Sequence, residues 1–482
     1  MGVAPRDAAV CLAILLAGCA VGPDFHAPPA PSVQTYTGTD GPATLAPGSG
    51  ETEQRIAAGT EIAAEWWELF GSPELTAAVR RAMAGSQTVA AARASLAQAR
   101  EVVVEARAAF FPQVDFSASA SRQQLSSSRS GVGSGQFDLF SIGPTVSYSP
   151  DLFGGTRRHV EEEAALAEQQ GWQLAGAYLT LTGNVVGEVL DVAGTRLEIA
   201  AVEKMVADDD RTLDLVRLKF EGGKAAETDV LSAETQRAND QAQLPPLRQR
   251  LATDRHALAI LAGAFPADWS PPELDLASLS LPGELPLTLP SELVHQRPDI
   301  LAAEADLHAA SAGVGVATAA MFPSIQLSAS VGQAAVTGGA LFEGASSTWA
   351  LASALAAPIF HGGALAAGRR AAIDAYEGSF ATYRETVLTA FGQVADTLDA
   401  LAHDADLVAD QRHALDVASR SLVLQRLSFQ EGKTDLLQLL DAERLALQAR
   451  LGYARAETQR YEDTATLLVA MGGRWWATSP ST

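Results

Sequence analysis

Apolar residues recur at intervals of seven in two long stretches of this chain. The first series is Tyr178, Val185, Val192, Ile199, Val206, Leu213 and Phe220. The second series is Ile373, Phe380, Val387, Val394, Leu401, Val408, Leu415, Leu422 and Phe429. A strict seven-residue repeat keeps one apolar seam of a helix against its neighbours when the helices supercoil. Each series therefore predicts a very long, coiled-coil-like helix.

The two series belong to an internal duplication. Adding 209 to a residue number places Phe220 on Phe429, and the similarity continues from residues 217–234 to residues 426–443, where eight of eighteen positions are identical. A Gly-Lys dipeptide directly follows each helix, as Gly223-Lys224 in the first segment and Gly432-Lys433 in the second. A tight turn between antiparallel helices favours glycine, which accepts a positive φ. We therefore expect two long helical hairpins, one in each half.

Proline placement marks the extent of these helices. No proline occurs from Asp151 to Leu244 or from Ile359 to Ser479, and a proline inside a helix costs about 3 kcal/mol. Helices over residues 156–221 and 364–431 would each be about 100 Å long at about 1.5 Å per residue. By contrast, many prolines interrupt the stretch from Pro245 to Pro298, which predicts a loop-rich connector.

Apolar and polar residues alternate in four shorter runs, which we expect to be strands at residues 113–123, 139–149, 324–334 and 346–357. Helical segments at residues 72–109 and 299–321 precede the two strand pairs, and each ends at a Phe-Pro dipeptide. Strands of roughly ten residues span a bilayer when they are tilted. Four strands cannot close a membrane barrel, and lipid does not tolerate open strand edges. The chain is therefore expected to form an oligomer, with eight strands in a dimer or twelve in a trimer.

The N-terminus has the features of a lipoprotein precursor. Residues 1–18 are predicted to be a signal peptide, and Leu16-Ala17-Gly18-Cys19 resembles a bacterial lipobox. The resemblance implies lipidation of Cys19, and Ala20 in place of an aspartate implies sorting to the outer membrane. The alternative is an ordinary signal peptide with an incidental cysteine. No later stretch of eighteen apolar residues predicts a transmembrane helix.

These patterns divide the chain as follows. Residues 19–50 form an extended, lipid-anchored linker rich in Pro, Gly, Ser and Thr. Each structural repeat then contains a helix, two strands and a long helical hairpin. The first repeat covers residues 51–265, a connector covers 266–298, the second repeat covers 299–472, and a tail covers 473–482.

Composition excludes several classes of function. A net charge of −23 disfavours nucleic-acid binding, because few cations remain to neutralise phosphates. The eight histidines show no metal-ligand spacing, and the chain lacks both a phosphate-binding loop and a Gly-x-Ser-x-Gly motif. We therefore expect no metal, no cofactor and no enzymatic activity.

Several motifs together resemble one family. They are the Phe-x-x-Gly-Lys turns at Phe220–Lys224 and Phe429–Lys433, the Phe-Pro breaks, Pro358-x-Phe360-x-Gly362-Gly363, and Arg297-Pro298-Asp299-Ile300. With the lipobox, they make the chain similar to TolC-type outer-membrane factors of the lipid-anchored branch that pairs with resistance-nodulation-division efflux pumps. The resemblance implies a mainly α homotrimer with a twelve-stranded β-barrel in outer-membrane lipid and a long periplasmic α-helical barrel. It also implies a passive duct that receives substrate from an inner-membrane pump through a periplasmic adaptor protein.

The same resemblance implies a closed aperture at the hairpin ends. Its aromatic residues would be Phe220 and Phe429, its carboxylates Asp229 and Asp441, and its adaptor contacts Gly223, Lys224, Gly432 and Lys433. Two positions depart from the family pattern, because Gln438 replaces an acid and Thr434 replaces a basic partner. Alternatively, the phenylalanines are the last members of their apolar series, and the aspartates are solvated charges near helix N-termini.

Two other functions fit part of the pattern. A periplasmic adaptor lipoprotein also has a lipobox and a coiled-coil hairpin, but it would show one hairpin flanked by β-rich domains. A structural coiled-coil lipoprotein would have no use for strands of ten residues. Two hairpins and two strand pairs favour the channel. The sequence does not identify its substrate.

Overall fold

A computed structural model of the protein describes residues 20–38, 44–45, 54–60, 62–125 and 135–473. The chain forms two compact units. Unit 1 combines Met1–Pro28, Ser95–Gln170 and Ala302–Tyr383, and unit 2 combines Pro29–Ala94, Gly171–Leu301 and Arg384–Thr482. Each unit takes segments from both predicted repeats, because the strand pairs of the two repeats associate with one another, and so do the two hairpins.

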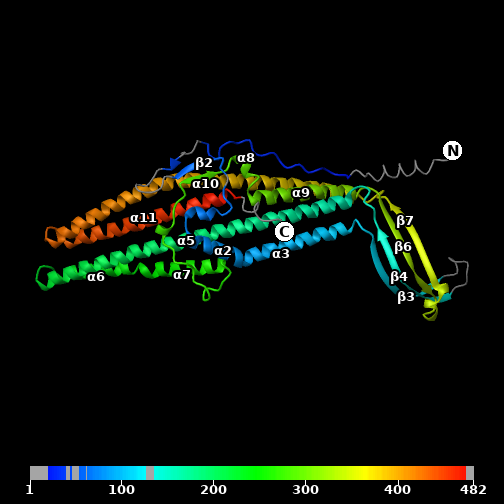
Figure 1. Ribbon diagram of the computed structural model, residues 1–482, viewed down its shortest axis with the longest axis horizontal. Coiled ribbons are helices and arrows are strands. Elements are labelled where there is room, and N and C mark those ends of the chain that lie inside the picture. Colours follow the sequence, from blue (N-terminus) through cyan, green and yellow to red (C-terminus); the bar gives the residue numbers. More distant parts are fainter. Residues whose placement is uncertain (1–19, 39–43, 46–53, 61, 126–134, 474–482) are drawn as a thin grey trace. The chain divides into compact units, whose positions relative to one another are not determined.

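Unit 1 contains one antiparallel sheet in the order β3-β4-β6-β7 (Figure 1). Its strands are β3 (Gln113–Leu125), β4 (Gly135–Tyr148), β6 (Ser324–Ala335) and β7 (Ser347–Ala356). All four predicted strands are present, and β4 begins four residues earlier than expected. The pairing of β4 with β6, with Thr145 opposite Ser330, joins the strand pair of one repeat to that of the other.

The alternating pattern of the sequence places large apolar side chains on the surface of this sheet. Trp349 is 80% exposed, and Val114, Phe116 and Leu351 are also largely exposed. Within the described part of one chain, β3 and β7 each pair with a neighbour on one side only. Exposed apolar area of this kind marks a surface that another chain or lipid covers.

Helices connect to the sheet at sharp corners. α3 (Gln87–Ala108) leads into β3, and α9 (Pro298–Ala319) leads into β6. After the strands, α5 (Gly155–Glu221) and α10 (Ala364–Gln430) begin. Their bounds lie within one residue of those predicted from the heptad series and from proline placement. Two 3-10 turns, η3 (Gly339–Phe342) and η4 (Gly344–Ser346), separate β6 from β7.

An N-terminal strap, residues 20–25, is docked on unit 1. The Val21 N–H donates to the Phe153 carbonyl at 3.1 Å, and Arg158 donates to the Val21 carbonyl at 3.2 Å and to the Asp24 carboxylate at 2.7 Å. The Phe25 ring stacks on His308 of α9 with 4.4 Å between centroids. The predicted tether therefore follows the protein surface over these residues. Cys19 and the predicted signal peptide lie outside the described residues.

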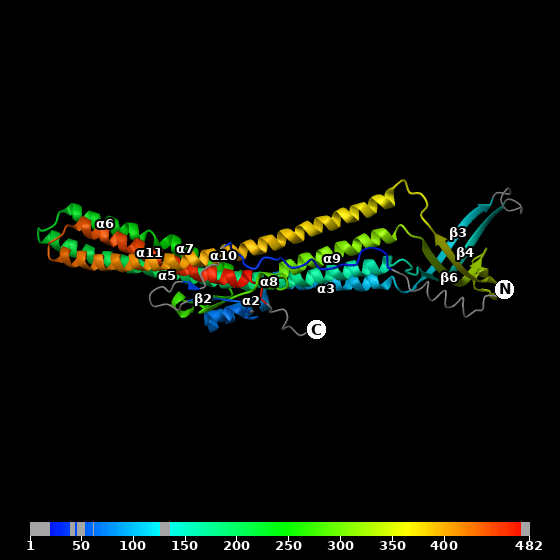
Figure 2. The same ribbon diagram turned by 90° about the horizontal axis from the view of Figure 1, so that it is seen from above.

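Unit 2 contains the two hairpins, which lie side by side (Figure 2). α5 pairs with α6 (Glu227–Gln241), and α10 pairs with α11 (Leu436–Ala470). Heptad residues of both series are buried in its cores, including Val185, Val192, Val394, Leu401 and Val408. This burial confirms the predicted apolar seams over most of their length, whereas Phe220 and Phe380 of the two series are exposed.

Around the hairpins, unit 2 carries smaller elements that differ from the sequence prediction. The segment predicted as one helix, 72–109, is broken at Ser86, whose extended backbone separates α2 (Pro73–Gly85) from α3. The predicted loop-rich stretch 245–298 begins with a helix, α7 (Leu244–Leu261). Its two prolines lie in the first helical turn, where their missing N–H groups have no intrahelical partner to lose.

A three-stranded sheet in unit 2 was not predicted. It contains β1 (Thr44–Leu45), β2 (Gln54–Ala58) and β5 (Glu284–Leu287), with β2 parallel to β5. Strands of two to five residues are too short to display a period of two. The short helices η1 (Trp66–Phe70), η2 (Leu276–Ser278) and α8 (Pro290–Leu293) complete this region.

The strap provides a test of the fold. We expect Arg158→Ala to raise the exchange rate of the Val21 amide at least tenfold, because the buried Arg158 side chain holds both Val21 and Asp24. Arg157→Ala is the matched control, because Arg157 is more exposed and contacts Asp151 instead. Hydrogen exchange with mass spectrometry is the measurement, and equal protection in both variants would contradict the role assigned to Arg158.

Candidate functional site

The two hairpin tips are built on the same backbone motif. At the end of α5 the Lys224 N–H donates to the Lys219 carbonyl at 2.8 Å, and the Gly223 N–H donates to the Phe220 carbonyl at 2.9 Å. At the end of α10, Lys433 and Gly432 make the corresponding bonds to Ser428 and Phe429 at 2.8 and 3.1 Å. These pairs of bonds define a Schellman motif, which requires a left-handed residue after the helix. Gly223 and Gly432 supply it with φ of 67° and 73°.

The returning helices begin with different carboxylates. In α11, Asp435 is the N-cap and accepts a hydrogen bond from the Gln438 N–H at 2.9 Å. In α6 the N-cap is Ala226, which has no side-chain acceptor, and the Asp229 carboxylate accepts from the Ala226 N–H at 2.9 Å. Asp229 therefore stabilises the first turn of α6, where a negative charge also interacts favourably with the helix dipole.

The two phenylalanines of the candidate aperture have different environments. Phe429 is 6% exposed and belongs to the core between the hairpins, whereas Phe220 is 44% exposed. The Lys219 ammonium group lies 3.7 Å from the centroid of the Phe429 ring and donates to the Phe429 carbonyl. This cation–π contact links the last turn of α5 to the last turn of α10.

Asp441 lies on the exposed face of α11, one turn beyond the tip. It accepts a hydrogen bond from Arg444 at 2.6 Å, and both side chains are about half exposed. The two positions that depart from the family pattern contact each other, because the Thr434 hydroxyl donates to the Gln438 side chain at 2.5 Å. This neutral contact replaces the acid–base pair that the resemblance implies.

Both turn lysines are exposed at the tips. Lys433 forms an ion pair with Glu431, its neighbour in the same turn. An exposed pair of this kind contributes little to stability. The adaptor contacts predicted for Lys224 and Lys433 therefore stay a prediction.

A buried polar cluster behind the tips was missed by the sequence analysis. It joins α5, α10 and α11 through the Thr212–Glu443 hydrogen bond at 2.7 Å and the Arg426 contacts with Glu443 at 3.2 Å and Asp208 at 3.6 Å. Asp209 and Asp240 complete the cluster, and both are buried. These residues are drawn from α5, α6, α10 and α11.

The heptad spacing contains a signal for this cluster. In the first series Val206 is at position a, so Asp209 is at position d, which faces the same seam. Glu188 and Asp404 also occupy d positions in their series. Burial raises the pKa of Glu188 to about 7 and that of Asp404 to about 7, each with nearby carboxylates adding to the shift. An acid at a d position is therefore a sign of a buried carboxyl rather than of a solvated one.

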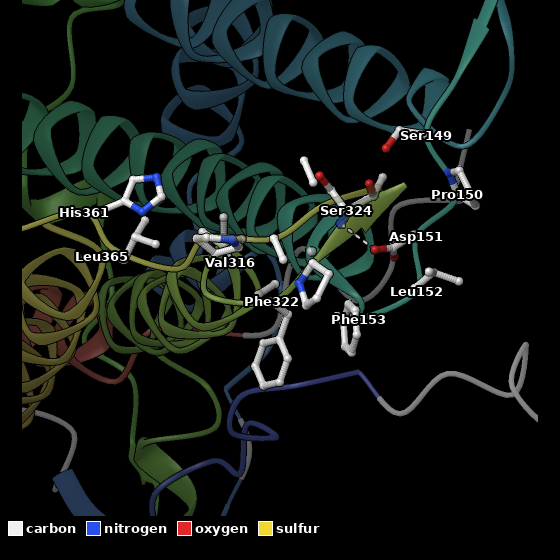
Figure 3. A pocket seen from close by; sticks show the side chains of 18 residues that line it. Ser149, Pro150, Asp151, Leu152, Phe153, Val316, Phe322, Ser324, His361 and Leu365 are labelled. Carbon is white, nitrogen blue, oxygen red and sulfur yellow. Dashed lines mark hydrogen bonds between the residues drawn. The ribbon is translucent and has the colours of Figure 1, made fainter. Parts of the chain in front are cut away.

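Unit 1 has a cavity of about 570 Å³ at the corners between strands and helices (Figure 3). Its wall includes the stacked rings of Phe153 and Phe322, 4.8 Å apart. The Asp151 carboxylate accepts hydrogen bonds from the N–H groups of Thr156 and Arg157 at 3.2 and 3.0 Å and so caps α5. Ser149 donates to the Ile325 carbonyl at 3.0 Å. These polar groups hydrogen-bond to the backbone of the corner itself, so we assign the cavity no ligand.

Two features are absent from the part of the chain that the structure describes. In that part of the chain, no group of three or more His, Cys, Asp or Glu side chains is arranged to hold a metal ion. Over the same residues, no helix is both long and apolar enough to cross a membrane.

The first turn offers a matched pair of glycines for a test. We expect Gly223→Ala to destabilise the tip by about 1 kcal/mol, because a non-glycine residue is strained at a positive φ. Gly222→Ala should be neutral or slightly stabilising, since Gly222 has no positive φ and the other hairpin has Glu431 at this position. Hydrogen exchange of the Lys224 amide measures the difference, and equal effects would contradict the assigned turn.

Comparisons with known proteins agree with this architecture. Residues 78–264 and 289–473 match the outer membrane efflux protein family. The pyoverdine export outer membrane protein OpmQ of Pseudomonas aeruginosa is 32% identical over 429 residues, which cover 87% of this chain and 90% of OpmQ. The toluene efflux pump outer membrane protein TtgI of Pseudomonas putida is 28% identical over 468 residues, which cover 96% and 97% of the two chains.

A solved structure shows the same fold over nearly the whole chain. The outer-membrane channel OprN superimposes with a TM-score of 0.85 at 26% identity, covering 95% of this chain and all of that one. These matches confirm the fold class and the channel function predicted from the sequence. The chain belongs to the outer membrane efflux protein family, whose members form trimeric outer-membrane channels.

Proposed function

We propose that three copies of this chain form a passive duct that crosses the outer membrane and is closed at the hairpin tips. The observation that carries the proposal is the four-stranded sheet, in which β3 and β7 each keep one unpaired edge in the described chain. Lipid contains no water that could hydrogen-bond to the backbone groups of such edges. Pairing β7 of one copy with β3 of the next gives both edges their hydrogen bonds. Three sheets joined in this way supply twelve strands.

The helices support the same assembly. Large apolar side chains on α10 and α11 point away from the hairpin core, and Leu424 is 64% exposed. Others with more than half of their surface exposed are Leu388, Val423, Leu427 and Leu437. Each Å² of apolar area removed from water contributes about 25 cal/mol, so neighbouring copies gain stability by covering this face.

The proposed duct carries no energy source of its own. We infer that the chain is not a catalyst and that transport energy comes from an inner-membrane resistance-nodulation-division pump through a periplasmic adaptor protein. The exposed tips at Gly223, Lys224, Gly432 and Lys433 are the proposed adaptor contacts. The names of two relatives refer to pyoverdine and toluene, which supports a duct whose cargo is selected by the pump.

The proposed aperture consists of Phe220, Asp229, Phe429 and Asp441 from three chains. The exposed Asp441 and the partly exposed Phe220 are available to line it, whereas the buried Phe429 would hold the two hairpins in register through Lys219. Asp229 would act by fixing the start of α6. The four proposed residues thus form two groups: side chains that face the duct, and side chains that hold the helices in place.

The lipid anchor completes the proposal. Lipidation of Cys19 would attach the N-terminus to the outer membrane, and several acyl chains on one residue give stable anchoring. The docked strap supports this placement, because Val21 and Asp24 are fixed at the start of α5, close to the sheet. A large periplasmic part would then extend away from the anchored end.

Asp441 provides a direct test of the aperture. We expect Asp441→Asn to change the single-channel conductance and to lower the preference for cations, because it removes three negative charges, one from each chain, and leaves Arg444 without its carboxylate partner. The measurement is conductance and reversal potential of the purified protein in a planar bilayer.

The control is Asp416→Asn. Asp416 is an exposed acid on α10 that pairs with Arg420 at 3.7 Å, so the substitution removes a similar charge away from the tip. Its conductance should equal that of the wild type. Equal conductance and cation preference in Asp441→Asn and Asp416→Asn would make Asp441 a surface charge and remove it from the aperture.

A further inference from the structure

The strongest unexplained feature of unit 2 is the carboxyl group of Asp209. Its side chain is 3% exposed, and neither oxygen accepts a hydrogen bond from any described donor. Thr212 and Arg426 donate to Glu443 and thus satisfy one of its oxygens, whereas the other Glu443 oxygen is buried without a partner. A buried carboxylate without a partner is strongly destabilising, so such a group becomes neutral instead.

Asp240 lies within side-chain hydrogen-bonding reach of Asp209, so the two carboxyl groups can share a proton. Its two oxygens accept hydrogen bonds from Gln236 at 2.9 Å and Gln243 at 3.0 Å, which leaves it a satisfied acceptor. Two adjacent carboxyl groups cannot both ionise cheaply, and one proton between them forms a hydrogen bond. Asp209 on α5 would then be the donor, and Asp240 on α6 the acceptor.

We propose that a proton held between Asp209 and Asp240 of the first hairpin locks the buried cluster behind the tips, so that loss of this proton places a charge beside Glu443 of the second hairpin and loosens the tips. This lock depends on the proposed function only in its link to the aperture. The cluster itself joins α5 of the first hairpin to α10 and α11 of the second.

The charges around the proton favour its retention in the packed state. With the pair itself, the cluster holds five acidic groups and four arginines, and Arg211 and Arg237 are engaged by Asp208 and Asp210. The charged groups facing the pair from the four helices are Asp208, Asp210 and Arg211 on α5, Arg237 on α6, Arg426 on α10, and Glu443 and Arg450 on α11.

The direction of the pH effect follows from this environment. Burial, with Asp240 and Glu443 nearby, raises the pKa of Asp209 to about 8, and burial raises the pKa of Glu443 as well. When the hairpins separate and water enters, the Asp209 pKa returns to the ordinary value of 3.8. Separation therefore releases a proton between about pH 4 and pH 8, and rising pH favours it by up to about tenfold per pH unit.

Hydrogen exchange of the full-length protein in detergent tests the lock without requiring a conducting channel. After correction for intrinsic exchange, we expect the opening equilibrium of amides in α6 and at both tips to increase at least about tenfold from pH 6 to pH 8. In Asp209→Asn the increase should be below about threefold, because the amide donates to Asp240 without a titrating proton. Asp240→Asn keeps the buried Asp209 carboxyl and its proton, so this variant should retain an increase with pH.

Asp214→Asn is the matched control, because Asp214 is an exposed acid on the same helix. It should show the wild-type increase with pH. A wild-type equilibrium that does not change between pH 6 and pH 8, or an unchanged increase in Asp209→Asn, would overturn the lock.

Conductance at pH 6 and pH 8 separates the lock from the proposed function. If exchange depends on pH as expected and the protein conducts more at pH 8, the lock acts on the aperture. If exchange behaves as expected in every variant but no preparation conducts, the lock stands and the channel proposal fails. If conductance depends on pH equally in the wild type and in Asp209→Asn, the link between this proton and the aperture is excluded.

Discussion

Burial of the seven-residue apolar seams is the interaction on which the rest of this structure depends. Val185 and Val394 are buried in one core, and Val216 and Leu422 in another, so the two hairpins are held together along their lengths. Both cores take side chains from both hairpins, so each hairpin completes the burial of the other's seam. The glycine turns, the caps and the polar cluster all act on a pair of hairpins that this seam first brings together.

A single chain leaves strand edges and apolar surface uncovered. Its sheet has two edges that pair on one side only within the described residues, and its helices expose apolar side chains such as Leu388 and Leu424. These surfaces have no use in an isolated chain, and a closed ring of copies covers them. In the proposed duct, the tips form the narrow end, where side chains from several chains meet.

The sequence predicted the features that have a strong period. The long helices and the four strands follow from spacings of seven and two, and the turns follow from Gly223 and Gly432. The short strands β1, β2 and β5 were missed because they are too short to show a period, and because β2 pairs with β5 more than two hundred positions away. The burial of Asp209 was missed because its depth depends on which helices surround the seam, and a run of three acids is usually solvated.

The most direct test of the central claim is the oligomeric mass of the purified, detergent-extracted protein, determined together with its single-channel conductance in a planar bilayer. We expect a mass of three chains and small, cation-preferring conductance steps, because three sheets close one barrel and acidic side chains line the narrow end. A monomer or dimer without conductance would contradict the duct, since one or two copies supply too few strands for the proposed barrel.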